Sequence, residues 1–217
     1  MSAAERTEPG SWAKSITRAV AGQIRHWRDV RGFSALDLSV KTAELGHEVP
    51  RSVIANLENN RRDVITLAEI LILSAALEIP PILLMTPLGR SAVIEVLPHI
   101  AISPWRVRGW IMGTVDLLAD VSPRAGRDVP PSRWRDGRDI IDLFEVHHSL
   151  IDEYSARQRQ LERALRDDMS GIDDWIKVLD YTRQRLINHR ALMRRLELAP
   201  PDLPAAIANI LDEADTS

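Results

Sequence analysis

The sequence predicts an all-α protein, with an N-terminal bundle of five short helices and a C-terminal pair of long helices. Residues 13–89 contain two Ser/Thr-led capping patterns, and glycine or proline stands at the predicted helix ends. From residue 140 to 165 a mostly apolar stripe recurs four and three positions apart, which is the spacing of one helix face. These three observations together predict the fold class.

Composition places the chain among globular proteins, since 45% of its 217 residues are hydrophobic. Cysteine is absent, which excludes a disulfide framework and any thiolate metal site. The N-terminus has no apolar core of signal-peptide length, and no apolar run approaches the ~20 residues of a membrane span. We therefore expect a cytoplasmic protein that does not associate with a membrane.

The net charge of −3 argues at first against nucleic acid as a partner, but the charge is unevenly distributed. Residues 13–89 carry a net +1 and residues 90–138 a net +3, whereas residues 139–217 carry a net −6. Any surface that faces DNA is therefore expected in the first two thirds of the chain, with an acidic module after it.

Residues 1–12 are predicted to be a flexible N-terminus, and residues 13–89 a compact helical domain. Gly32 is expected to end the first helix, whose apolar face is Ile16, Val20, Ile24 and Trp27. Ser34 and Asp37 have capping-box spacing at the start of a second helix, which Gly46 stops. The inner face of that helix is predicted to be Ala35, Leu38, Thr42 and Leu45.

A third helix is predicted after the turn at residues 46–49, with Pro50 at its first position. Ile54 and Leu57 are expected to face inward. The outer face then carries Arg51, Ser52, Ala55, Asn56, Asn59 and Asn60. Arg, Ser and Asn side chains match the hydrogen-bond donors and acceptors on DNA base edges, so this helix is a candidate reader of DNA.

Thr66 and Glu69 form a second capping pattern, which opens a fourth helix. Its buried stripe is predicted to be Leu67, Ile70, Leu71, Ser74 and Leu77. Pro80 and Pro81 break this helix, and residues 82–85 form a short fifth one.

Residues 90–138 are interpreted as a mixed region of helix and Arg/Pro-rich linker. Its first part, residues 90–104, is rich in β-branched residues and predicts a strand or an extended arm. A helix is expected over residues 105–118, and a loop after it. Arg and Trp interleave over residues 105–138; we favour a linker with buried tryptophans, and a second DNA contact is the alternative.

Residues 139–217 are predicted to form an antiparallel helical hairpin with a reversal at residues 168–171, followed by a short helix over residues 205–214. The stripe on its first helix includes Ile140, His147, Tyr154 and Leu165. This hairpin is the candidate dimerisation or partner-binding module. Two amphipathic helices that pack only on each other within one chain are the alternative.

The motifs of residues 16–87 resemble those of the XRE/Cro-repressor family of phage repressors and their actinobacterial relatives. The resemblance lies in the Ser-led second helix with Leu38, the Gly46 turn, the pattern of Ile54, Leu57 and Glu58, and the final residues 77–80. Ala35 stands where the family usually has Gln. Asn60 stands where it usually has Gly, and Asn tolerates the left-handed backbone. The resemblance implies a five-helix helix-turn-helix domain and a transcriptional repressor that binds double-stranded DNA as a homodimer.

In this reading, residues 50–59 dock in the major groove, and Arg51, Ser52 and Asn56 read bases. Asn59, Arg61 and Arg62 contact phosphate, and Lys41 is a further candidate. Glu58 is expected to be structural and to hold a neighbouring backbone group or an Arg.

Nothing in the sequence indicates an enzyme, a cofactor or a metal site. No serine lies in a G-x-S-x-G context, no Gly-rich phosphate loop is present, and His147 lacks a carboxylate at ligand spacing on its face. Two further hypotheses stay open beside the regulator. One is an antitoxin-like or partner-sensing protein whose acidic C-terminal helices bind another protein, and the other is a small-molecule sensor with a C-terminal pocket.

Overall fold

The computed structural model describes residues 11–117, 132–167, 170–205 and 207–208, which fall into two units, Met1–Arg127 and Asp128–Ser217. The described residues are mostly helical, as predicted. They also include two short strands, which depart from the all-α class but lie within residues 90–104, where a strand is one of the two expectations. Of the predicted flexible N-terminus only Ser11 and Trp12 are described, and they begin the first helix. The loop predicted after residue 118 lies outside the described residues up to residue 131, and from Ser132 on it is helical instead. Among the described residues, no helix combines the length and the apolar character that a membrane crossing needs.

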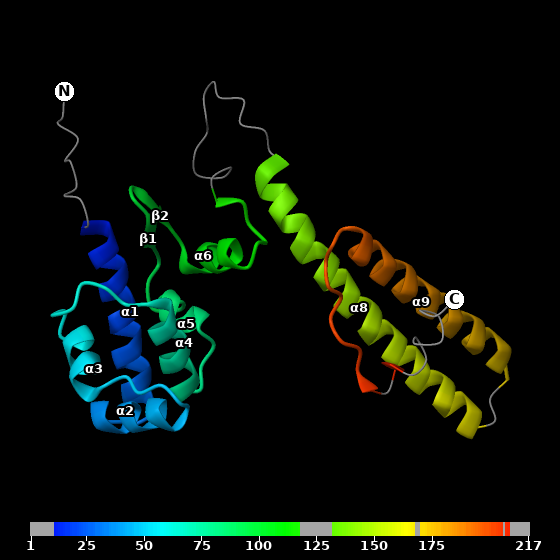
Figure 1. Ribbon diagram of the computed structural model, residues 1–217, viewed down its shortest axis with the longest axis horizontal. Coiled ribbons are helices and arrows are strands. Elements are labelled where there is room, and N and C mark those ends of the chain that lie inside the picture. Colours follow the sequence, from blue (N-terminus) through cyan, green and yellow to red (C-terminus); the bar gives the residue numbers. More distant parts are fainter. Residues whose placement is uncertain (1–10, 118–131, 168–169, 206, 209–217) are drawn as a thin grey trace. The chain divides into compact units, whose positions relative to one another are not determined.

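The first unit begins with five helices, in the order predicted from the sequence (Figure 1). They are α1 Ser11–Val30, α2 Ala35–Glu44, α3 Arg51–Glu58, α4 Leu67–Ala76 and α5 Ile82–Met85. Helix α1 contacts α3 and α5, and α2 contacts α3 and α4. The core that these helices share consists of fully buried side chains, among them Ile24, Leu38, Ile54, Leu57, Leu73, Leu77 and Leu84.

Both predicted capping boxes are confirmed. The Ser34 hydroxyl accepts from the Asp37 backbone N–H at 3.1 Å, and the Asp37 carboxylate accepts from the Ser34 N–H at 2.7 Å. Hydrogen bonds that the carboxylate accepts from the Ser34 side chain and the Ser34 backbone lower the pKa of Asp37. Thr66 and Glu69 make the same reciprocal pair at the start of α4. Each box satisfies backbone donors that a helix start otherwise leaves unpaired.

Two predicted inner faces are partly wrong. Leu45 is exposed, because α2 ends at Glu44 and Leu45 is its C-cap. Leu67 and Leu71 of α4 are also exposed, while Leu73 and Ala76 are buried in the core. Helix α4 is apolar around nearly its whole circumference. Its sequence pattern therefore predicts a helix but does not predict which face of that helix packs into the core.

The rest of the first unit is a small subdomain with its own core. Strands β1 (Ile94–Leu97) and β2 (Ile100–Ile102) form an antiparallel hairpin, and α6 (Pro104–Ile111) follows. Helix α6 ends earlier than predicted. Trp105 is exposed with the Arg108 guanidinium 4.7 Å from its ring centroid, which corrects the expectation of a buried tryptophan there.

The second unit contains two long helices that run antiparallel, as predicted (Figure 1). Helix α8 (Ser132–Arg166) begins at Ser132 rather than at residue 139, and α9 (Ile172–Arg195) returns along it. Leu150, Tyr154 and Leu186 are buried between them, whereas Ile140 and Leu165 at the ends of the predicted stripe are exposed. Ala205, Ile207 and Ala208 are helical, and the remainder of the predicted tail helix lies outside the described residues.

His147 lies inside this helical pair and is 1% exposed. Its Nε2 accepts a hydrogen bond from the Arg190 guanidinium at 2.9 Å, which requires the neutral ring. Burial, followed by the nearby charges of Arg190, His189 and His148, lowers the pKa of His147 to about 4. The folded protein therefore holds this histidine uncharged at neutral pH.

We expect His147 to make stability fall with acidification. Its folded pKa of about 4 lies below the ordinary value of 6.5, so the contribution is fully present above pH 6.5 and is lost as the pH falls toward 4. The variant His147→Gln should show a shallower decline in the free energy of unfolding between pH 6.5 and 4, measured by urea denaturation. Equal slopes in the two proteins would contradict a neutral, buried His147.

Candidate nucleic-acid interface

The turn between α2 and α3 is fixed by its own hydrogen bonds. Gly46 has φ +91°, the left-handed conformation that permits the chain to leave α2. The Val49 N–H donates to the Thr42 hydroxyl at 2.9 Å, and both residues are buried. Pro50 caps α3 rather than beginning it, so the helix starts one residue later than predicted.

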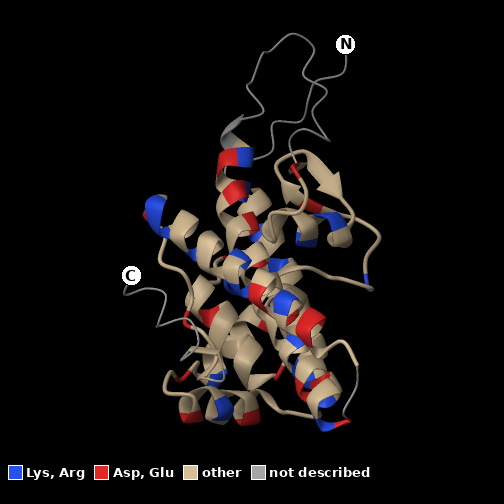
Figure 2. Cartoon of the chain, turned by 90° about the vertical axis from the view of Figure 1, so that its right-hand side faces the viewer, with Lys and Arg blue, Asp and Glu red and all other residues tan. Residues whose placement is uncertain are grey.

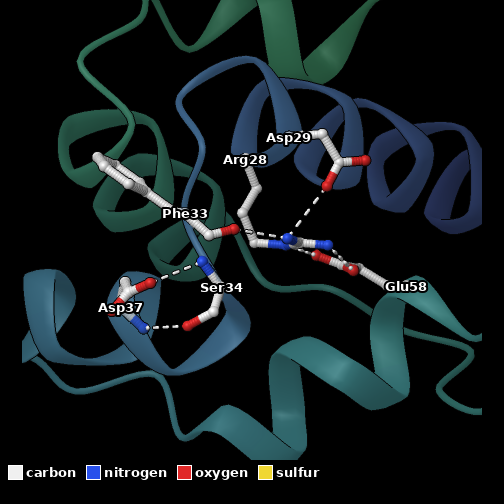
Figure 3. Close-up of polar contacts among 6 residues, drawn as sticks. All are labelled: Arg28, Asp29, Phe33, Ser34, Asp37 and Glu58. Atoms are coloured by element: carbon white, nitrogen blue, oxygen red, sulfur yellow. Dashed lines mark hydrogen bonds and ion pairs between the residues drawn. The ribbon is translucent and has the colours of Figure 1, made fainter.

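One ion pair holds the far end of α3 against α1 (Figure 3). The Arg28 guanidinium of α1 donates to both oxygens of Glu58, at 2.7 and 2.8 Å, and also to the Phe33 carbonyl at 2.7 Å. Asp29 lies 3.1 Å from the same guanidinium. The hydrogen bond that Arg28 donates to Glu58 is the largest cause of a raised Arg28 pKa. Glu58 is therefore structural, as expected, and its partner is Arg28, which the sequence does not single out.

The outer face of α3 is polar and exposed. Arg51, Ser52 and Asn56 are exposed on it, and Asn59 follows as the C-cap. Ser52 and Asn56 are four residues apart and Asn56 and Asn59 three apart, so these side chains are neighbours on the helix surface. Within the described parts of the chain, none of these four side chains makes a hydrogen bond or an ion pair. Ala55, predicted on the same face, is half-buried.

The segment after α3 is held against α1. Asn60 has φ +55°, the left-handed conformation predicted for this position. Lys14 of α1 pairs with Asp63 at 2.8 Å, and the Thr17 hydroxyl donates to the Asp63 carbonyl at 3.0 Å. These contacts fix the loop that carries Arg61, which is exposed, and Arg62.

Arg62 already has a partner. Its guanidinium pairs with Glu69, the same carboxylate that closes the Thr66 capping box. Burial raises the pKa of Glu69, but hydrogen bonds from Arg62 and Thr66 and the charge of Arg62 outweigh it and lower the pKa overall. Lys41 is also engaged, since its ammonium lies 4.9 Å from the Phe33 ring centroid. A phosphate contact by either residue has to share or replace these interactions.

The structure therefore leaves Arg51, Ser52, Asn56 and Asn59 exposed on α3 and at its end, and places Arg61 on the loop that follows. Basic and acidic residues are otherwise interspersed along the helices (Figure 2). The described residues contain no group of three His, Asp or Glu side chains placed to hold a metal ion.

Comparison with known proteins adds no relative: neither a protein-family model, nor a curated protein, nor a solved structure matches this chain.

Proposed function

We propose that this chain is a sequence-specific DNA-binding transcriptional regulator, a repressor rather than an enzyme, and that α2, the Gly46 turn and α3 form its helix-turn-helix. One observation carries the proposal. The inner side of α3 is anchored by Ile54 and Leu57 in the core, while Arg51, Ser52 and Asn56 point outward. A helix held from behind that displays these side chains has the chemistry of a base-reading helix.

The roles follow from the chemistry of each side chain. A planar Arg51 guanidinium matches guanine O6 and N7, and the Asn56 amide matches adenine N6 and N7. Ser52 reads either base type as donor or acceptor. Asn59, Arg61, Arg62 and Lys41 are assigned to phosphate, which fixes the register of the domain on the duplex without reading sequence.

Two copies are needed for this function. A domain with one such helix covers one half-site, and pairing two domains raises the affinity for a two-fold symmetric operator. We therefore propose a homodimer on double-stranded DNA, with the α8–α9 unit as its dimerisation module.

Selection of binding sites from random duplexes tests the proposal with the full chain. We expect enrichment of one short motif, and a preference for that motif over random duplex that persists at moderate ionic strength. Failure to enrich any motif, or equal affinity for selected and random duplexes, would refute sequence-specific binding.

The phosphate role of Arg62 has its own expected result. Arg62→Ala should weaken binding to all sequences alike and reduce the slope of log affinity against log salt by about one unit. Glu69→Gln is the matched variant, because Gln keeps the capping box but releases Arg62 from its ion pair. We expect Glu69→Gln to bind at least as tightly as the parent. A salt slope unchanged in Arg62→Ala would show that Arg62 serves only Glu69.

A further inference from the structure

Among the described residues, the α8–α9 unit has one side covered by its own chain and one side left open. On the covered side, Arg190 donates to the Pro201 carbonyl at 2.8 Å, and Leu203 and the fully buried Ile207 pack against the helices. The opposite side, here called the open face, consists of Val146, Glu153 and Arg157 of α8 with Tyr181 and Arg185 of α9 and the α9 C-cap residue Leu196. Three of its six residues are large apolar or aromatic side chains that stay exposed: Val146 is 46%, Leu196 52% and Tyr181 66% exposed.

Contacts along and across the two helices show that four of these residues share a face. Arg185 of α9 donates to Glu153 of α8 at 2.9 Å, and Arg157 donates to the same carboxylate at 3.3 Å. The Arg185 guanidinium also lies 5.8 Å from the Tyr181 ring centroid. Val146 precedes Glu153 by two helical turns on α8, so it lies on the same side of the helix.

The open face carries a hollow at one end. Asp139, Asp142, Leu143 and Val146 line this hollow, which has a volume of about 300 Å³. The antiparallel pairing sets Arg185 level with Glu153 and Arg190 level with His147. Leu196, further along α9, is therefore level with the turn of α8 that lines the hollow. The exposed Leu196 and the hollow therefore lie at the same position along the axis of the helical pair.

We propose that the open face binds a second copy of this chain, with the two-fold axis running along the helical pair. Such an axis lays α9 of one copy over α8 of the other at equal height. The partner's Leu196 then enters the hollow beside Val146, the partner's Arg185 faces Glu153, and the partner's Tyr181 faces Arg157. Each contact occurs twice, as an isologous interface requires. The partner's Leu196 then packs on Leu143 and Val146, its Arg185 meets an opposite charge, and its Tyr181 ring meets a cation.

The direction of the axis rests on the proposed DNA-binding function, whereas the choice of surface does not. An axis along the helices places both α8 N-termini at the same end of the dimer. An axis across the helices would send them to opposite ends of α8, roughly 52 Å apart for a 35-residue helix. Half-sites one turn of DNA apart are separated by only about 34 Å.

Sedimentation of the full chain without DNA tests the surface. We expect the parent to sediment at twice its chain mass of 24.4 kDa at micromolar concentration, and Val146→Asp and Leu196→Asp to sediment as monomers with unchanged helix content. Ile176→Asp is the control and should stay dimeric, because Ile176 is similarly exposed, at 44%, but lies outside the open face. A monomeric parent, or a dimer that survives both open-face substitutions, would overturn the proposal.

Disulfide cross-linking tests the direction of the axis. Because the chain has no cysteine of its own, only the introduced cysteines can form a cross-link. We would prepare Glu153→Cys and Arg185→Cys as separate proteins, mix them and oxidise. A cross-linked species in the mixture, and none in either protein alone, is expected, because the proposed axis sets these two positions opposite each other at equal height and a disulfide needs Cα atoms within about 7 Å. A strong cross-link in Glu153→Cys alone would instead place α8 against the partner's α8 and overturn the axis. Neither test uses DNA, so a dimer that binds no operator would refute the DNA-binding proposal and leave the open face standing.

Discussion

Glu58→Ala is expected to lower the free energy of unfolding by about 3 kcal/mol, because it leaves a mostly buried guanidinium without its carboxylate. The side chains of Arg28 and Glu58 are only 15% and 9% exposed. Asp29 stays within reach of Arg28 but is largely exposed, so it offsets little of the loss. Urea denaturation of the full chain, followed by circular dichroism, measures the change.

The double variant Arg28→Leu/Glu58→Leu is the control for the unpaired Arg28 charge that Glu58→Ala leaves behind. Replacing both partners of a buried pair with apolar residues is often nearly neutral, so the double variant should be more stable than Glu58→Ala. A loss within about 0.5 kcal/mol for Glu58→Ala, which is typical of surface substitutions, would show that the ion pair does not hold α3 in place.

Arg51→Ala is expected to weaken binding to the selected operator by about 1–3 kcal/mol and to relax the preference at one base position. Arg51 is exposed at the first turn of α3, so its removal should leave the fold intact. Competition binding with duplexes that vary each base in turn measures both effects.

Arg25→Ala is the matched control, because Arg25 is exposed on α1 and its substitution removes the same charge from the same unit. We expect it to change affinity far less and to leave the base preferences unchanged. Equal losses on operator and random duplex for Arg51→Ala would assign Arg51 to phosphate and refute its base-reading role.

The parts of the fold that local chemistry determines could be predicted from sequence. The capping boxes at Ser34 and Thr66 depend on residues three apart, and the reversals at Gly46 and Asn60 depend on a single left-handed residue. The stripe through His147 and Tyr154 also predicted the buried centre of α8. In each case the signal and the structure span only a few residues.

Features that depend on distant partners were missed or only partly predicted. The composition of residues 119–138 suggested a loop throughout, yet α8 begins at Ser132. The inward face of α4 depends on packing against α2, which its uniformly apolar sequence does not encode. At the candidate site, the exposure of Arg51, Ser52 and Asn56 follows from helical spacing. The ion pair of Arg62 with Glu69 depends on how the intervening loop folds, which spacing does not reveal.

Under the proposed DNA-binding function, the position of Arg28 has a consequence for the rate of association. This single guanidinium joins α1, the loop before α2 and the end of α3 through Glu58 and the Phe33 carbonyl. A helix that is fixed in this way before it meets its target has little conformational entropy left to lose on contact. Association should then be limited by diffusion and orientation rather than by local ordering of the protein.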